Sequence, residues 1–142
     1  MMMLLALAAS VSASPKDAMS SAEATSPDYD VCRERASQNG GDGAQGECTR
    51  AEIARADAAL NRLWPQIIVA AEGRNSEIGW ALLEEQRAWI AYKSANCRHY
   101  YIGSAGTMET QLFGPWCELR TITDRTGYLE GVLTELGGSI EQ

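Results

Sequence analysis

The chain has 142 residues, with 12 Lys and Arg against 19 Asp and Glu and a formal net charge of -7 at pH 7. This length corresponds to one small domain, and no apolar run approaches the ~20 residues that a membrane-spanning helix needs. The acidic balance argues against nucleic acid as a partner, because affinity for phosphates comes mainly from Lys and Arg. It favours a basic partner.

The first residues predict export. Residues 1–13 hold a short apolar block from Met1 to Ala9, with small residues following at Val11 and Ala13, the spacing that a signal peptidase reads. We therefore expect a signal peptide over 1–13 and a periplasmic or secreted protein. No Lys or Arg precedes the block, so a disordered start is the alternative. No Cys follows the block directly, which argues against a lipid anchor.

Residues 14–31 are rich in Ser, Ala, Asp and Pro and show no apolar periodicity. Such a composition is typical of a flexible segment. The sequence therefore predicts a flexible tether over 14–31 and a folded domain over 32–142.

Apolar residues then recur at steps of three and four, which predicts an amphipathic helix from Asp42 to about Ala71. Asp42 and Gln45 have the spacing of a capping box at its start. Pro65 lies inside the pattern, where its ring would collide with the carbonyl of Asn61. We expect a kink or break there.

Two more helices follow. Asn75 or Ser76 can cap a second helix running to about Cys97, and a third begins near Pro115 and stops at the Gly137-Gly138 pair. The inward stripe of the second helix is Leu82, Leu83, Gln86, Trp89, Ile90 and Cys97. Nothing predicts a strand. The expected fold is all-α, a small monomeric three-helix bundle stapled by two disulfides.

The four Cys residues predict two disulfides in an oxidising compartment. The short sequence separations favour neighbour pairing, Cys32 with Cys48 and Cys97 with Cys117. In an up-down-up bundle, pairing of Cys48 with Cys97 and of Cys32 with Cys117 is also feasible.

Residues for catalysis or cofactor binding are few. His99 is the only His, and the Cys spacings lack the close pairs of structural zinc sites. Glu84 and Glu85 are adjacent on a helix, so they point in different directions and cannot flank one bond; a solvated helix face is the simpler interpretation. We expect neither an enzyme nor a cofactor or metal protein.

Polar residues occur on all three inward faces. Asp57, Gln86 and Arg125 each lie among apolar neighbours at helical spacing. Because an unpaired buried charge is costly, they should find one another. The sequence predicts a structural network in which Asp57 pairs with Arg125 or Lys93.

These residues are also where the chain resembles a known family. The runs ECTRAEIARADAALNRLW, LLEEQRAWIAYKSANC, GSAGTM and CELRTITDRTGYL resemble the LprI N-terminal domain family, small exported bacterial proteins with four Cys. The resemblance covers about residues 32–133, and its motif positions here are Cys32, Cys48, Asp57, Leu60, Asn61, Leu82, Gln86, Trp89, Ile90, Tyr92, Cys97, Gly103, Ser104, Cys117, Arg125 and Leu129. The resemblance adds Asn61 and Trp89 to the predicted structural network. The chain departs from the family at Lys93, where Arg is common, and at Pro65.

The family takes its name from a lysozyme-inhibiting lipoprotein, so the resemblance implies an exported protein that blocks a basic lysozyme by protein–protein contact. The alternative is a non-inhibitory accessory or structural protein of the cell envelope. Loops on a rigid scaffold often carry binding, and the long Gly-containing segment from Tyr100 to Trp116 is the candidate contact region. Its candidate contacts are Ser104, Met108, Glu109, Phe113 and Trp116; a plain disulfide-tied connector is the alternative.

Overall fold

The computed structural model describes residues 25–102 and 106–140. Within them all regular structure is helical, which confirms the all-α class. The elements are α2 (Pro27–Asn39), α3 (Gly41–Ala70), α4 (Glu77–Asn96), the 3₁₀ turn η1 (Arg98–Tyr101), the π-helical turn η2 (Glu109–Phe113) and α5 (Gly114–Glu135). The expected number of helices was wrong, because the described residues form four long helices instead of three. The predicted signal peptide over 1–13 lies outside the described residues.

The additional helix is α2, which overlaps the predicted tether. Ser26 caps it by accepting a hydrogen bond from the Tyr29 N–H at 3.2 Å, Pro27 lies in its first turn, and Asp28 and Asp30 place negative charge at its N-terminus. These are the groups that stabilise a helix start. The tether prediction is therefore wrong for residues 27–31, while residues 14–24 lie outside the described part of the chain.

Three contacts hold α2 against α3. The Cys32–Cys48 disulfide joins the two helices. The hydroxyls of Tyr29 and Thr49, both buried, lie 3.1 Å apart. The carboxylate of Glu52, only 3% exposed, accepts hydrogen bonds from the backbone N–H of Ser26 at 2.8 Å and from its hydroxyl at 2.7 Å. Glu52 therefore connects α3 to the cap of α2.

We expect Glu52→Ala to lower the free energy of unfolding by about 1 to 3 kcal/mol, because it leaves the Ser26 donors and Arg55 without their acceptor. Urea denaturation measures this loss. Glu47→Ala is the matched control, since the Glu47 side chain is 76% exposed on the same helix. A loss in the control as large as that in Glu52→Ala would contradict a specific role for Glu52.

The effect should depend on pH. Burial by itself raises the pKa of Glu52, but hydrogen bonds from Arg55 and Ser26 outweigh it, so the pKa lies below its ordinary value of 4.5. A carboxyl group with a lowered pKa contributes its stabilisation above the unfolded-state pKa and loses it as the pH falls through the folded-state pKa. The stability difference between wild type and Glu52→Ala should thus shrink below pH 4.5.

Helix α3 differs from expectation at its start and at Pro65. Gly40 precedes it without a side-chain cap, so Asp42 forms no capping box. Gly41 has φ +63, a conformation that glycine adopts readily, and this allows the tight turn from α2. The helix then continues through Pro65 without a break. Pro65 and Asn61 are both exposed, so water can solvate the carbonyl that loses its partner.

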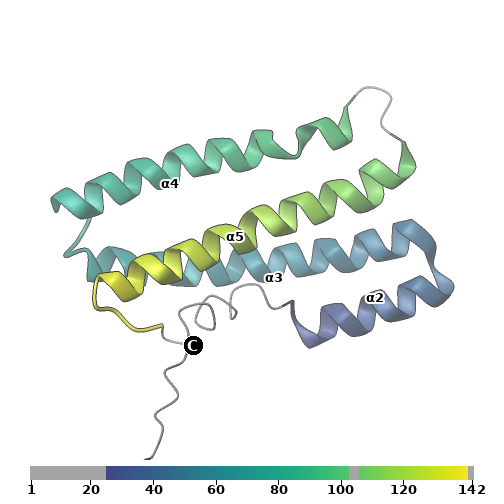
Figure 1. Ribbon diagram of the computed structural model, residues 1–142, viewed down its shortest axis with the longest axis horizontal. Coiled ribbons are helices and arrows are strands. Elements are labelled where there is room, and N and C mark those ends of the chain that lie inside the picture. Colours follow the sequence, from purple (N-terminus) through teal and green to yellow (C-terminus); the bar gives the residue numbers. More distant parts are fainter. Residues whose placement is uncertain (1–24, 103–105, 141–142) are drawn as a thin grey trace, which may run out of the picture.

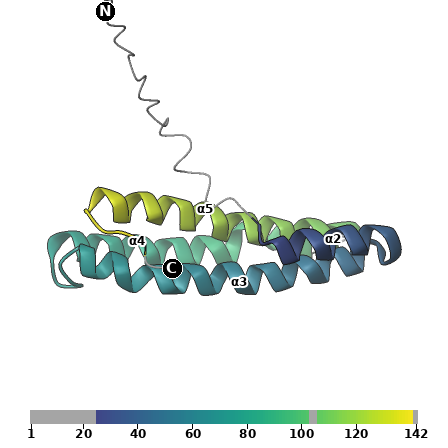
Figure 2. The same ribbon diagram turned by 90° about the horizontal axis from the view of Figure 1, so that it is seen from below.

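The four helices alternate in direction (Figures 1 and 2). Helices α3 and α5 lie side by side along the bundle, α2 covers the part of α3 near its start, and α4 runs along α5. The largest buried apolar side chains come mainly from α3 and α5: Leu60, Leu63, Ile67, Leu119, Ile122, Leu129 and Leu133. This core holds α5 in place, and residues of α5 contribute to both candidate binding surfaces of the protein.

Helix α4 begins and packs partly as predicted. The Ser76 side chain accepts from the Gly79 N–H at 2.9 Å and caps the helix. Leu82 and Gln86 are buried, but Ile90 is 50% exposed, so its assignment to the inward stripe is wrong. At the end of α5 the Gly138 N–H bonds to the Leu133 carbonyl at 2.9 Å, beside Gly137 at φ +79, which is the predicted glycine stop.

Candidate functional site

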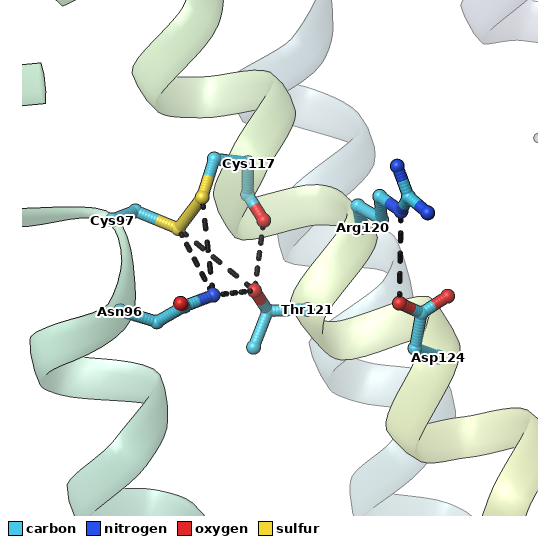
Figure 3. Close-up of a disulfide and its surroundings, with 6 residues drawn as sticks. All are labelled: Asn96, Cys97, Cys117, Arg120, Thr121 and Asp124. Carbon is cyan, nitrogen blue, oxygen red and sulfur yellow. Dashed lines mark hydrogen bonds and ion pairs between the residues drawn. A yellow bond between two sulfur atoms is a disulfide. The ribbon is translucent and has the colours of Figure 1, made fainter.

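The second disulfide, Cys97–Cys117, joins the end of α4 to the first turn of α5 (Figure 3). The Asn96 amide donates to the Thr121 hydroxyl oxygen at 2.9 Å, and that hydroxyl donates to the Cys117 carbonyl at 2.9 Å. Together with Cys32–Cys48 this is the favoured neighbour pairing, and the crossed pairing is excluded. Residues 98–116, here called the tied segment, are closed at their base by this bond.

The tied segment is more ordered in its described residues than the predicted long loop. It contains η1, η2 and a helical start from Thr107. A Cβ at Gly46 would lie 2.1 Å from the Gln111 carbonyl oxygen, so glycine permits η2 to approach α3. A Cβ at Gly114 would lie 2.4 Å from the Tyr101 ring, so a second glycine admits that ring. The tied segment is thus packed onto α3 at Gly46, and within the segment the Tyr101 ring packs against Gly114, the first residue of α5.

Large apolar side chains of the tied segment are exposed. Taken together they are here called the apical surface: Tyr101 (40% exposed), Ile102 (56%), Met108 (47%), Phe113 (40%) and Trp116 (50%). Three predicted contacts, Met108, Phe113 and Trp116, are therefore available to a partner. Glu109 is half-buried, and Ser104 lies outside the described residues. Sequence reasoning missed Tyr101 and Ile102, although they stand in the same segment.

Electrostatic contacts fix one edge of this surface. Burial and the neighbouring Glu118 carboxylate raise the pKa of Tyr101 well above its ordinary value of 10.0. The phenol stays protonated at neutral pH and can donate to Glu118. The ring of Tyr100 lies 6.3 Å from that of Phe113, joining η1 to η2.

The predicted structural network divides into two parts. Lys93 donates to Asp57 at 2.8 Å, which is one of the two predicted pairings. Arg125 does not pair with Asp57; it donates to the Gln86 side-chain oxygen at 3.0 and 2.8 Å, and to Glu85. The ring of Trp89 lies 5.5 Å from the Lys93 ammonium and 5.7 Å from the Arg125 guanidinium.

Two residues of this region differ from expectation. Glu85 was expected on a solvated helix face, but it binds Arg125 and accepts from the Tyr128 hydroxyl at 3.3 Å. Asn61 is exposed and shares no hydrogen bond with the network as far as the structure describes it. Glu85 lies four residues before Trp89, so the two side chains share one side of the helix. This spacing could have placed Glu85 in the predicted network.

Within residues 25–102 and 106–140, no three His, Cys, Asp or Glu side chains come together as a metal site, and no helix has the length and apolar character to span a membrane. Glu84 pairs with Arg87 and Glu85 with Arg125, so the two carboxylates face different partners. What the arrangement offers is an exposed apolar surface on a covalently closed scaffold.

A comparison with protein-family models matches the chain to the model described as lysozyme inhibitor LprI, over residues 32–129. The match spans all four Cys residues and ends within α5. No curated protein and no solved structure matches the chain.

Proposed function

The chain belongs to the lysozyme inhibitor LprI family, and from this membership we propose that it is an exported protein that inhibits a basic lysozyme by protein–protein contact. The observation that carries the proposal is the apical surface. Five half-exposed apolar side chains from one short segment are available to a partner.

The scaffold under the patch supports tight binding. The Cys97–Cys117 bond and the close approach at Gly46 fix the tied segment before any partner arrives. Preorganisation reduces the ordering cost of association. A rigid apolar patch is therefore a better inhibitor surface than a free loop of the same composition.

Charge and compartment are consistent with the proposal. The net charge of -7 attracts a basic enzyme and speeds association. Two disulfides within a small domain are typical of secreted and periplasmic proteins. Inhibition would follow if the bound protein keeps the enzyme from its polysaccharide substrate.

The test measures lysis by a basic animal lysozyme and by a bacterial muramidase, together with direct binding of the oxidised protein to each enzyme. We expect Met108→Ala with Phe113→Ala to speed dissociation on the order of tenfold, because each removes an interface side chain. Glu109→Gln should instead slow association, and higher salt should do the same in wild type, since screening shortens from ~10 Å at 0.1 M to ~3 Å at 1 M.

Trp80→Ala is the control, because Trp80 is 61% exposed on α4 and lies outside the tied segment. It should leave both rates unchanged. If neither enzyme binds wild type at low salt, the inhibitory function is wrong and the accessory envelope role is the better conclusion. Binding that survives loss of Met108 and Phe113 but not of Trp80 would place the contact elsewhere.

A further inference from the structure

A second surface lies between α4 and α5 and is distinct from most of the apical surface. It is a groove of about 440 Å³, open to solvent, whose floor is formed by Cys117, Thr121 and Arg125. Figure 3 shows the floor residues Cys117 and Thr121 beside Arg120 and Asp124. Of the apical residues only Trp116 also lines this groove.

The α5 wall of the groove is regular. Trp116, Arg120, Asp124 and Tyr128 recur at every fourth residue, so they lie in one row along the helix. At 1.5 Å per residue this row is about 18 Å long. The opposite wall comes from α4 and includes Trp89, Tyr92 and Asn96. The shape suits an extended chain better than a compact small molecule.

The side chains that line the groove are aromatic, charged or polar, with Cys117, and none is aliphatic. Tyr92, Trp116 and Tyr128 are 54%, 50% and 51% exposed. A guanidinium lies over one face of the Trp116 ring and of the Tyr128 ring, at 5.6 Å from Arg120 and 5.1 Å from Arg125, so a ligand would pack on the remaining exposed ring surface. Along the α5 row, an aromatic ring stands at each end and two hydrogen-bonding residues stand between the rings. A protein partner would place an apolar, charge-depleted centre in such a groove. Here Arg120 and Asp124 stand between the two rings.

A sugar chain fits this combination of aromatic rings and hydrogen-bonding groups. Each pyranose ring has an apolar C–H face, which packs on an aromatic ring, and an edge of hydroxyl groups, which bind planar side chains such as Arg, Asp and Asn. We propose that the groove between α4 and α5 binds an extended glycan that bears carboxylate groups. This binding does not depend on the proposed lysozyme inhibition.

Arg120 indicates the acidic character of the glycan. Its side chain is 65% exposed, and its guanidinium lies 3.7 Å from Asp124, a long ion pair between exposed groups, which is weak. The guanidinium also lies 5.6 Å from the centre of the Trp116 ring, so the ring positions it. An oriented guanidinium binds a carboxylate through two parallel hydrogen bonds.

The experiment titrates the oxidised chain, without lysozyme, with two soluble tetrasaccharides and follows heat or Trp fluorescence. One alternates N-acetylglucosamine with N-acetylmuramic acid and carries carboxylates; the other is neutral chitotetraose. We expect binding of both and tighter binding of the acidic one. Tyr92→Ala should weaken both on the order of tenfold, the loss of one ring contact. Arg120→Ala should remove only the preference for the acidic glycan.

Trp80→Ala is again the control, because this exposed ring on α4 does not line the groove. Absence of binding to either tetrasaccharide overturns the proposal, as does equal weakening by Trp80→Ala. If Tyr92→Ala lowers lysozyme affinity and no glycan binds, the groove is a protein contact. Glycan binding without lysozyme binding would support the groove and reject only the inhibitory function.

Discussion

Replacing Cys97 and Cys117 together by Ala is expected to lower the free energy of unfolding by about 3 kcal/mol and also to abolish tight binding of lysozyme. Bridging residues separated by 20 positions restricts the unfolded chain by roughly that amount. Binding is lost because the tied segment is no longer closed at its base. The conformational entropy of ordering it then opposes association. Urea denaturation and direct binding measure the two effects.

The other disulfide provides the matched control. Cys32 and Cys48 are separated by 16 positions, so their double Ala variant should lose a similar ~3 kcal/mol of stability. That bond joins α2 to α3 and does not close the tied segment, although Gly46, which η2 contacts, lies two residues from Cys48. Lysozyme affinity of the folded protein should therefore fall much less than in the Cys97 and Cys117 variant. Wild type unfolded without reductant should show no free thiol. Equal loss of affinity in both double variants would mean that general loosening of the domain, and not the tied segment, governs binding.

The sequence predicted the three longer helices and missed the short one, whose buried face consists of few residues. Periodicity located α3, α4 and α5, and glycines marked the end of α5. Helix α2 buries only Tyr29 and Ala36, with Cys32 partly buried, and is also held by a disulfide, the Tyr29 hydroxyl and the Glu52 carboxylate. The order Ser26, Pro27, Asp28 is nevertheless a helix-start signal, and it was hidden in a segment whose composition indicates flexibility.

Polar pairings were only partly predictable. Pattern placed Asp57, Gln86 and Arg125 on inward faces, but it could not say which pairs meet, because that depends on the rotation of each helix. Arg125 reaches Gln86 and Glu85 on α4, and Asp57 on α3 meets Lys93. The groove between α4 and α5 could not be predicted from the sequence either, because its two walls come from separate helices.

Arg125→Ala should lower the free energy of unfolding by about 2 to 4 kcal/mol, because it leaves the buried Gln86 oxygen unpaired and removes the partner of Glu85. The loss should be below the full cost of stranding a buried charge, since the Glu85 side chain is 41% exposed and water can solvate it. Arg120→Ala, on the exposed side of the same helix, should change stability by no more than about 0.5 kcal/mol.

Double-mutant cycles separate the two parts of the network. Arg125 and Glu85 should show a coupling energy of about 1 kcal/mol or more, whereas Arg125 and Asp57, which do not touch, should show none beyond about 0.5 kcal/mol. Asp57 and Lys93 should couple by at most about 1 kcal/mol, because both side chains are partly exposed at 42% and 30%. Arg125→Lys should recover only part of the stability, since a Lys ammonium cannot reproduce the two hydrogen bonds to one Gln86 oxygen while also reaching Glu85. Full recovery by Lys would mean that Arg125 acts through its charge alone, and coupling between Arg125 and Asp57 would contradict the helix rotation seen here.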